Sequence, residues 1–169
     1  MENHIVVLMG TSGVGKSSVA RSLEDNGYSR VSLDDIIHRM REGCDNDSLK
    51  GHEVNQAYLE LSKQVAQALE SSNVVVDEWF YNEGTLDVFL TDIDPHTPVH
   101  YFHLTGDLDT LLERARSDPN PKRLGKVEKH YGMTYDKPGR YYRELPLRTI
   151  DIAGKSPHDI KALITKQVR

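Results

Sequence analysis

The sequence contains a single cysteine, Cys44, and no hydrophobic run long enough to cross a bilayer. One cysteine excludes an intrachain disulfide and a zinc site built from several cysteines. The longest apolar run, Ile5 to Met9, is too short for a transmembrane helix or a signal-peptide core. Basic residues are also fewer than acidic ones, 21 against 26, which gives a net charge of −5 with neutral histidines. This balance argues against a protein that coats nucleic acid through bulk charge, and these absences together predict a cytoplasmic protein without a membrane segment.

Short apolar strands and amphipathic helices alternate along the 169 residues, a length typical of one domain. Continuous apolar runs predict buried strands, and apolar residues spaced three and four apart predict helices. The expected strands are 5–9, 29–33, 74–76, 99–104 and 147–152, and helices are expected around the apolar positions at 19–23 (with a stop at Gly27), 36–40, 54–69, 108–115 and 157–168. This alternation predicts an α/β fold in three layers, a parallel sheet with helices on both faces. Because ligands bind beyond the carboxyl ends of such strands, functional residues are expected where the strands end.

The segment after the first expected strand carries the most specific signal in the chain. Residues 10–17 read G-T-S-G-V-G-K-S, the complete phosphate-binding pattern G-x-x-x-x-G-K-[ST] between a strand and a helix. Its glycines allow backbone N–H groups to turn toward phosphate oxygens, and the helix adds its positive N-terminal end. A glycine-rich turn that binds nothing is the alternative. We expect ATP to contact Gly10, Thr11, Ser12, Gly13, Val14, Gly15, Lys16, Ser17 and Ser18.

Within this loop, Lys16 is expected to reach the β- and γ-phosphates and to act in catalysis. Nucleotide binding alone does not distinguish a kinase from a switch or a motor. The sequence lacks the Asn-Lys-x-Asp segment that reads guanine in GTPases, and its length leaves little room for the further modules of a motor. The chain is therefore interpreted as a small ATP-dependent phosphotransferase.

An acidic pair, Asp34 and Asp35, follows the second expected strand at the edge where the phosphate loop opens. Phosphoryl transfer depends mainly on positioning and charge neutralisation, and a hydroxyl acceptor needs a carboxylate to orient it and take its proton. Asp34 is the expected catalytic base and, with Asp35, is expected to contact the acceptor. Alternatively, Asp35 replaces Asp34 in that role, or the pair caps the helix that begins there.

A second acidic pair, Asp77 and Glu78, ends the third expected strand. A carboxylate at the tip of a buried strand suits a magnesium ion, and we expect Asp77, rather than Glu78, to hold Mg²⁺ together with the Ser17 hydroxyl. A solvated strand end without a metal is the alternative. His100 and His103 are three residues apart in an expected strand, so they point to opposite faces and do not chelate one ion.

Aromatic and basic residues complete the expected site. Trp79 follows the acidic pair and is expected either to wall the acceptor pocket or to pack in the core. Residues 117–127 carry two prolines and several charges and are expected to form a cationic lid over the nucleotide. Arg123 and Arg114 are the expected lid and nucleotide-binding arginines, because they would neutralise charge that develops during transfer. An ordinary solvated run of charge is the alternative.

The phosphate loop, the segment S-L-D-D-I-I at 32–37 and V-V-V-D-E at 74–78 together resemble chloramphenicol phosphotransferase and, more distantly, shikimate kinase and other small P-loop kinases. The stretch H-Y-G-M-T-Y-D at 130–136 is similar as well. The resemblance implies a five-stranded parallel sheet with a lid, ATP and Mg²⁺ as cofactors, and Asp34 at the position of the catalytic aspartate. The lid sequence departs from the family's shorter glycine-aspartate-arginine pattern. The resemblance covers about half of the chain and does not extend to the expected acceptor pocket at 41–69.

These patterns leave three hypotheses for function. The first is a kinase that phosphorylates a hydroxyl of a small molecule. The second moves the phosphate to a nucleoside, a nucleotide or a hydroxymethylated base in nucleic acid, which Arg140, Arg143 and Arg148 motivate and the negative net charge disfavours for a polymer. The third is a nucleotide-binding regulator or NTPase without a phosphorylated product. The sequence fits a monomer or a homodimer.

Overall fold

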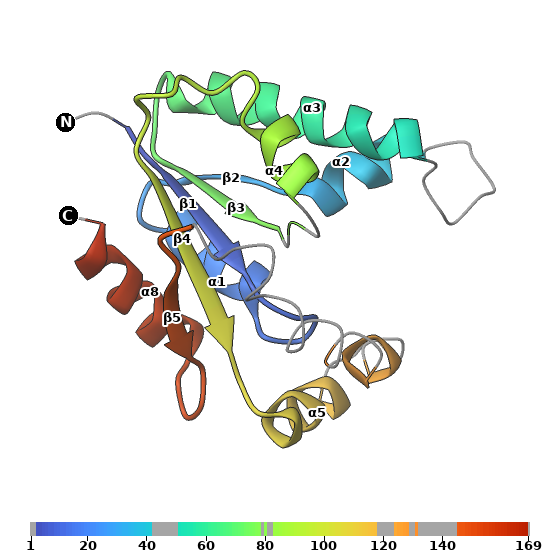
Figure 1. The fold of residues 1–169 in the computed structure, drawn as a ribbon. Coiled ribbons are helices and arrows are strands. Elements are labelled where there is room, and N and C mark those ends of the chain that lie inside the picture. The colour runs from blue at the N-terminus through green and yellow to red at the C-terminus, as the bar shows by residue number, and fades with distance from the viewer. Residues whose placement is uncertain are drawn as a thin grey trace.

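Five parallel strands form one sheet in the described part of the chain, and their spatial order is β2-β3-β1-β4-β5 (Figure 1). The computed structural model describes residues 3–41, 51–78, 80, 83–117, 124–128, 131 and 145–168. The strands are β1 (Ile5–Met9), β2 (Ser29–Val31), β3 (Val74–Asp77), β4 (Val99–Thr105) and β5 (Arg148–Asp151). All four strand pairings are parallel, which confirms the expected fold class.

Helices cover both faces of this sheet. One face carries α2 (Leu33–Met40), α3 (Gly51–Leu69) and α4 (Glu83–Phe89), and the other carries α1 (Lys16–Glu24), α5 (Leu108–Arg116) and α8 (Pro157–Gln167) (Figure 1). Every residue of β1 is buried, and alternate residues point into two separate cores, Ile5, Val7 and Met9 into one and Val6 and Leu8 into the other. A central strand with apolar residues on both faces is what this three-layer arrangement requires.

The register of the sheet brings three strand ends together. β1 lies between β3 and β4, and Leu8 pairs with Asp77 on one side while Met9 pairs with His103 on the other. From β1 the chain leads to β2 on one side of the sheet, and from β3 it crosses to β4 on the other side of β1. The connections that leave the adjacent strands β1 and β3 therefore run in opposite directions. Such a switch point leaves a crevice at the carboxyl ends of the strands. The loop after β1 therefore opens into the place where this fold binds ligands.

The second expected strand and the helix after it differ from the sequence prediction. β2 ends at Val31 instead of residue 33, and α2 begins at Leu33 instead of residue 36. Leu33 and Ile36 are both buried at helical spacing, so core packing extends the helix toward the strand. Asp34 and Asp35 consequently lie in the first turn of α2, and Ser32 occupies the N-cap position, so the prediction that this acidic pair caps the helix was wrong.

Other boundaries follow local signals with one addition. α8 begins as expected, with Ser156 and Asp159 forming a capping box and Pro157 in the first turn. α4 was not expected from the sequence; Leu86 and Phe89 are buried at a helical spacing of three. Within the described segments, no helix combines the length and apolar character needed to cross a bilayer.

Among the glycines whose surroundings the structure describes, Gly10 leaves the least room for a side chain. Its φ of +143° favours glycine, and an added Cβ would lie 2.5 Å from the backbone oxygen of Leu104. Gly27 also has a positive φ, +84°, but a Cβ added there would meet no heavy atom of the described residues within 4 Å. The two glycines therefore separate the effect of a steric clash from that of backbone conformation alone.

We expect Gly10→Ala to lower the free energy of unfolding more than Gly27→Ala. The Gly27 variant bears only the penalty of a left-handed backbone, about 1–2 kcal/mol. The Gly10 variant adds overpacking against a backbone carbonyl that cannot rotate away, about 1–3 kcal/mol more. Urea unfolding followed by circular dichroism measures both changes. Equal losses in the two variants would contradict the clash.

Candidate active site

The phosphate-loop pattern forms a tight turn between β1 and α1. Gly13 and Gly15 have positive φ values of +86° and +98°, so the loop uses its glycines as the pattern requires. The ammonium group of Lys16 donates hydrogen bonds to the carbonyl oxygens of Gly10 at 2.7 Å and Thr11 at 3.3 Å. Lys16 thus lies across the loop, and a cationic group stands where the phosphates of a nucleotide are expected.

Two segments distant in sequence pack against this loop. An added Cβ at Gly13 would lie 2.7 Å from Val127, which is fully buried in a short helical stretch at 124–128. This end of the expected lid at 117–127 is therefore packed into the fold. The guanidinium of Arg114 donates to the carbonyl oxygens of Val14 at 3.4 Å and of Ile152 and Lys155 at 3.2 Å each. Arg114 thereby joins the phosphate loop to the turn after β5, and its contact with a nucleotide stays a prediction.

Asp77 lies at the carboxyl end of β3 with its side chain 3% exposed. One carboxylate oxygen, Oδ2, accepts a hydrogen bond from Arg30 Nη2 at 3.3 Å. The other oxygen, Oδ1, is buried and has no hydrogen-bond partner among the described residues. A buried carboxylate oxygen without a partner is unfavourable unless a cation or water satisfies it, so Oδ1 is a suitable place for a metal ion or its water shell.

These residues fit magnesium rather than a metal held entirely by protein ligands. Across the described segments, no group of three or more His, Cys, Asp and Glu side chains forms a metal cage. Magnesium is commonly held by one or two carboxylates, with phosphate oxygens and water completing its six ligands. Asp77 offers the carboxylate, and Ser17 lies in the first turn of α1 directly after Lys16 at the phosphate loop. The predicted pair therefore suits a magnesium–nucleotide complex.

The sequence favoured Asp77 over Glu78 as the magnesium ligand. In the structure Glu78 also lies among the charged groups of the site. It accepts a hydrogen bond from the hydroxyl of Tyr58 on α3 at 2.9 Å. Burial raises the pKa of Glu78 to about 8; the Tyr58 hydrogen bond and the charge of Lys16 lower it, and the charges of Asp34 and Asp77 raise it. Lys16, Asp34 and Asp77 thus all act electrostatically on one carboxyl group.

His103 is a second residue of the site, which the sequence analysis considered only as a metal ligand together with His100. It lies in the β4 segment that pairs with Met9, and burial followed by the charge of Lys16 lowers its pKa. His100 contacts the ring of His4 on the opposite face of the sheet, with ring centroids 5.4 Å apart. The two histidines therefore point apart, as expected. The available signal for His103 was its place near the end of a strand next to the phosphate-loop strand.

Several predicted residues lie elsewhere or outside the described part. Arg148 begins β5, where its guanidinium lies over the ring of Phe102 and donates to the carbonyl oxygen of Gln167; its contact with an acceptor stays a prediction. Phe80, next to Trp79 in sequence, is fully buried against Tyr58 and Phe89. Predicted positions outside the described residues are Cys44, Trp79, Arg123, Arg140 and Arg143.

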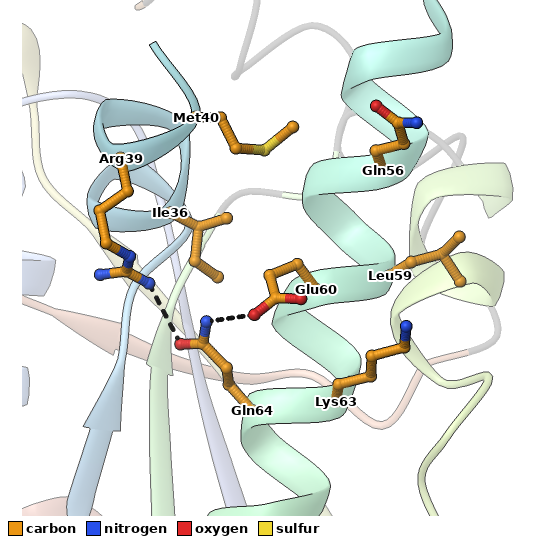
Figure 2. Close-up of a pocket in the computed structure, with 8 residues that line it drawn as sticks. All are labelled: Ile36, Arg39, Met40, Gln56, Leu59, Glu60, Lys63 and Gln64. Atoms are coloured by element: carbon orange, nitrogen blue, oxygen red, sulfur yellow. Dashed lines mark hydrogen bonds between the residues drawn. The ribbon is translucent and has the colours of Figure 1, made fainter. Parts of the chain in front are cut away.

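A separate cavity of about 490 Å³ lies between α2 and α3 (Figure 2). Its apolar lining is Ile36, Met40 and Leu59, and Gln64 bridges Arg39 and Glu60 along one side through hydrogen bonds of 3.3 and 2.7 Å. No residue of the phosphate loop and neither acidic pair lines it. This cavity is therefore distinct from the candidate active site.

The phosphate loop at a switch point of a five-stranded parallel sheet defines a P-loop nucleotide-binding fold, and solved structures agree. A gluconokinase from Sinorhizobium meliloti 1021 is similar, with a TM-score of 0.66 and 21% identity over 99% of this chain and 95% of that one. A sugar kinase from a Janibacter species has a TM-score of 0.67 and 17% identity, covering 98% and 94%. The tunicamycin resistance protein of Deinococcus radiodurans has a TM-score of 0.66 and 22% identity, covering 98% and 95%. These likenesses show a kinase-like fold.

Sequence comparison shows the family. A family model described as an AAA domain matches residues 5–123, more than half of the chain, and the chain belongs to this family. A nucleotide-binding protein from Coprothermobacter proteolyticus is 31% identical over 118 residues, which is 67% of this chain and 39% of that protein. The chain thus aligns with about two fifths of that curated relative. The narrower resemblance to chloramphenicol phosphotransferase stays a prediction.

We expect Glu78→Gln to remove part of the pH dependence of stability. Because the pKa of Glu78 is raised to about 8 in the folded protein, from 4.5 when unperturbed, the folded state retains a proton that the unfolded state has lost. This contribution is fully present below the unfolded pKa and is lost as pH rises through about 8. Between pH 6 and pH 9, wild type should lose on the order of 2 kcal/mol more than Glu78→Gln, since each pH unit corresponds to at most about 1.4 kcal/mol.

The measurement is urea unfolding in metal-free buffer at both pH values. Glu70→Gln, a change at an exposed carboxylate, serves as the matched control and should follow wild type. If Glu78→Gln loses as much stability as wild type between pH 6 and pH 9, the raised pKa of Glu78 is wrong.

Proposed function

We propose that the protein is an ATP- and Mg²⁺-dependent phosphotransferase that moves the γ-phosphate to a hydroxyl group of a small molecule. The observation that carries this proposal is the gathering of one phosphate-binding loop and several carboxylates at one edge of the sheet. The ammonium group of Lys16 donates a hydrogen bond within the loop. Besides burial and the Tyr58 hydrogen bond, the charges of Lys16, Asp34 and Asp77 all act on the pKa of Glu78. A plain nucleotide-binding protein does not need carboxylates on the side of the loop where an acceptor would approach.

The chain's own residues divide into a phosphate side and an acceptor side. Backbone amides of the phosphate loop and Lys16 hold the nucleotide phosphates, and Ser17 and Asp77 hold magnesium. Magnesium, when bound, neutralises charge on the phosphate oxygens. Asp34, exposed in the first turn of α2, orients the acceptor hydroxyl and takes its proton as transfer completes. Arg123 adds positive charge from the lid, and Asp35 and Trp79 contact the acceptor.

The names of similar solved structures and the charge of the chain support one class of acceptor. The similar gluconokinase and sugar kinase are named for hydroxyl-bearing acceptors, and the tunicamycin resistance protein is named for an antibiotic. These names and the resemblance to chloramphenicol phosphotransferase support a small polyhydroxyl compound or antibiotic. Arg148, which motivated a nucleic-acid acceptor, is bonded to the carbonyl oxygen of Gln167 and lies over the ring of Phe102, and the negative net charge disfavours a polymer.

The direct test is a screen for acceptor-dependent transfer of phosphate from labelled ATP. The panel contains sugars, gluconate, nucleosides, chloramphenicol, tunicamycin and a hydroxymethylated DNA oligonucleotide. A labelled small-molecule product would support the proposal. Hydrolysis of ATP that no acceptor stimulates would instead support an NTPase without a phosphorylated product.

We expect Asp34→Asn to separate transfer from binding. The amide keeps the shape of the side chain but cannot take a proton, so transfer should fall at least about a hundredfold, within the range that general-base catalysis contributes. Because Asp34 is not part of the phosphate loop, affinity for ATP measured by calorimetry should stay within about twofold. Asp25→Asn, an exposed change at the end of α1, is the control. Near-normal transfer by Asp34→Asn would remove Asp34 from its proposed role.

A further inference from the structure

Arg30 is a largely buried charged residue of β2, and it has no role in the proposed function. It is the middle residue of β2 and pairs with Val75 of β3, and its side chain is 17% exposed. The Nη1 atom lies 3.1 Å from Asp35 Oδ2 on α2, and the Nη2 atom lies 3.3 Å from Asp77 Oδ2 on β3. One guanidinium therefore joins two carboxylates that come from different elements of the candidate site.

The contact with Asp77 fixes how that carboxylate is presented. Arg30 occupies Oδ2, so Oδ1, which no described residue hydrogen-bonds, is the oxygen left for a ligand. Burial alone would lower the pKa of Arg30, but the charges of Asp77 and Asp35 outweigh it and raise that pKa. The guanidinium therefore stays charged, and a buried carboxylate that would otherwise be unfavourable has a paired charge.

The contact with Asp35 fixes the start of α2. β2 ends at Val31 and α2 begins at Leu33, so a short connection leads into the turn that carries Asp34 and Asp35. The Asp35 side chain is 58% exposed, and its bond to Arg30 is the hydrogen bond that the structure gives this side chain. Because Asp34 is adjacent in the same turn, a bond that holds Asp35 also limits the movement of Asp34.

We propose that Arg30 is a positioning residue that holds the first turn of α2 and the carboxylate of Asp77 in one fixed arrangement. This inference rests on the proposed function, in which Asp34 is the base and Asp77 the magnesium ligand. Arginine suits the role because its planar fork presents separate N–H groups to two acceptors, whereas a lysine ammonium is a single point of charge. Small displacements of reacting groups lower rates strongly, so Arg30 contributes to catalysis without itself touching the substrate.

The test combines Arg30→Met, Asp35→Asn and the double variant, with the acceptor found in the screen. Each single variant should lower kcat about tenfold or more, while the KM for ATP stays within about threefold because the phosphate loop is intact. The double variant should be no slower than the slower single variant, since both changes remove the same link. Arg30→Lys should keep the charge but recover little of kcat. Arg39→Met, at an exposed arginine of α2 bonded to Gln64, is the matched control and should retain kcat within about twofold.

A second readout uses the ligand-free protein and needs no turnover. Hydrogen exchange of the amides at 33–37 should be faster in both Arg30→Met and Asp35→Asn, and exchange in α3 should be unchanged. If Arg30→Met does not fold, Asp35→Asn still tests the link, because its side chain is largely exposed.

The outcomes separate the two proposals. Wild-type kcat in both single variants, losses that multiply in the double variant, or unchanged exchange at 33–37 would each overturn the role of Arg30. Absence of any phosphorylated product with wild-type protein would instead overturn the kinase function, and the exchange measurement would still show whether Arg30 holds the turn.

Discussion

The ammonium group of Lys16 is the charge on which the rest of the candidate site depends. It bridges two carbonyl oxygens of its own loop. Burial raises the pKa of Glu78 and lowers that of His103, and the charge of Lys16 acts to lower both. Glu78 follows β3 and His103 lies near the end of β4, while Lys16 follows β1. The parallel sheet brings these ends together because its central strand pairs with both neighbours in register. Lys16 thus shares this edge of the sheet with the carboxylates of Asp34, Asp77 and Glu78.

Buried carboxylates need a paired charge or a hydrogen-bond donor, and the described residues provide one for some carboxylate oxygens of the site but not for all of them. Asp77 has a partner for one oxygen in Arg30, whereas its other oxygen has none within the described segments. Glu78 has the Tyr58 hydroxyl, which only partly offsets burial, so its pKa stays raised to about 8. Uncompensated polar groups in a native structure commonly mark functional sites, because only a ligand or metal completes their interactions. Asp77 Oδ1 is such a group, because it is buried and has no hydrogen-bond partner among the described residues.

The sequence predicted the sheet and the phosphate loop well because both depend on local patterns. Continuous apolar runs identify strands buried on both faces, and the loop's glycines and lysine occur at fixed spacing. The start of α2 was misplaced because the burial of Leu33 is a tertiary effect that periodicity did not reveal. Tyr58 lies within the expected helix at 54–69, but nothing in the local sequence shows that its hydroxyl meets Glu78. Arg30 escaped notice for the same reason, because its partners lie on β3 and on the first turn of α2.

Proteins that differ widely in sequence can keep this fold and its phosphate loop, whereas the residues that would contact an acceptor can differ between them. Relatives with only 17–22% identity keep the same fold over nearly the whole chain. A phosphate loop binds largely through backbone amides, which any sequence with the right glycines can supply. An acceptor, by contrast, is recognised by side chains, and the proposed function assigns this role to the first turn of α2 and to the residue that follows Glu78. The ion pairs of Arg30 and the Tyr58–Glu78 hydrogen bond are side-chain contacts of this second kind, so under the proposed function they are where specificity for an acceptor can arise.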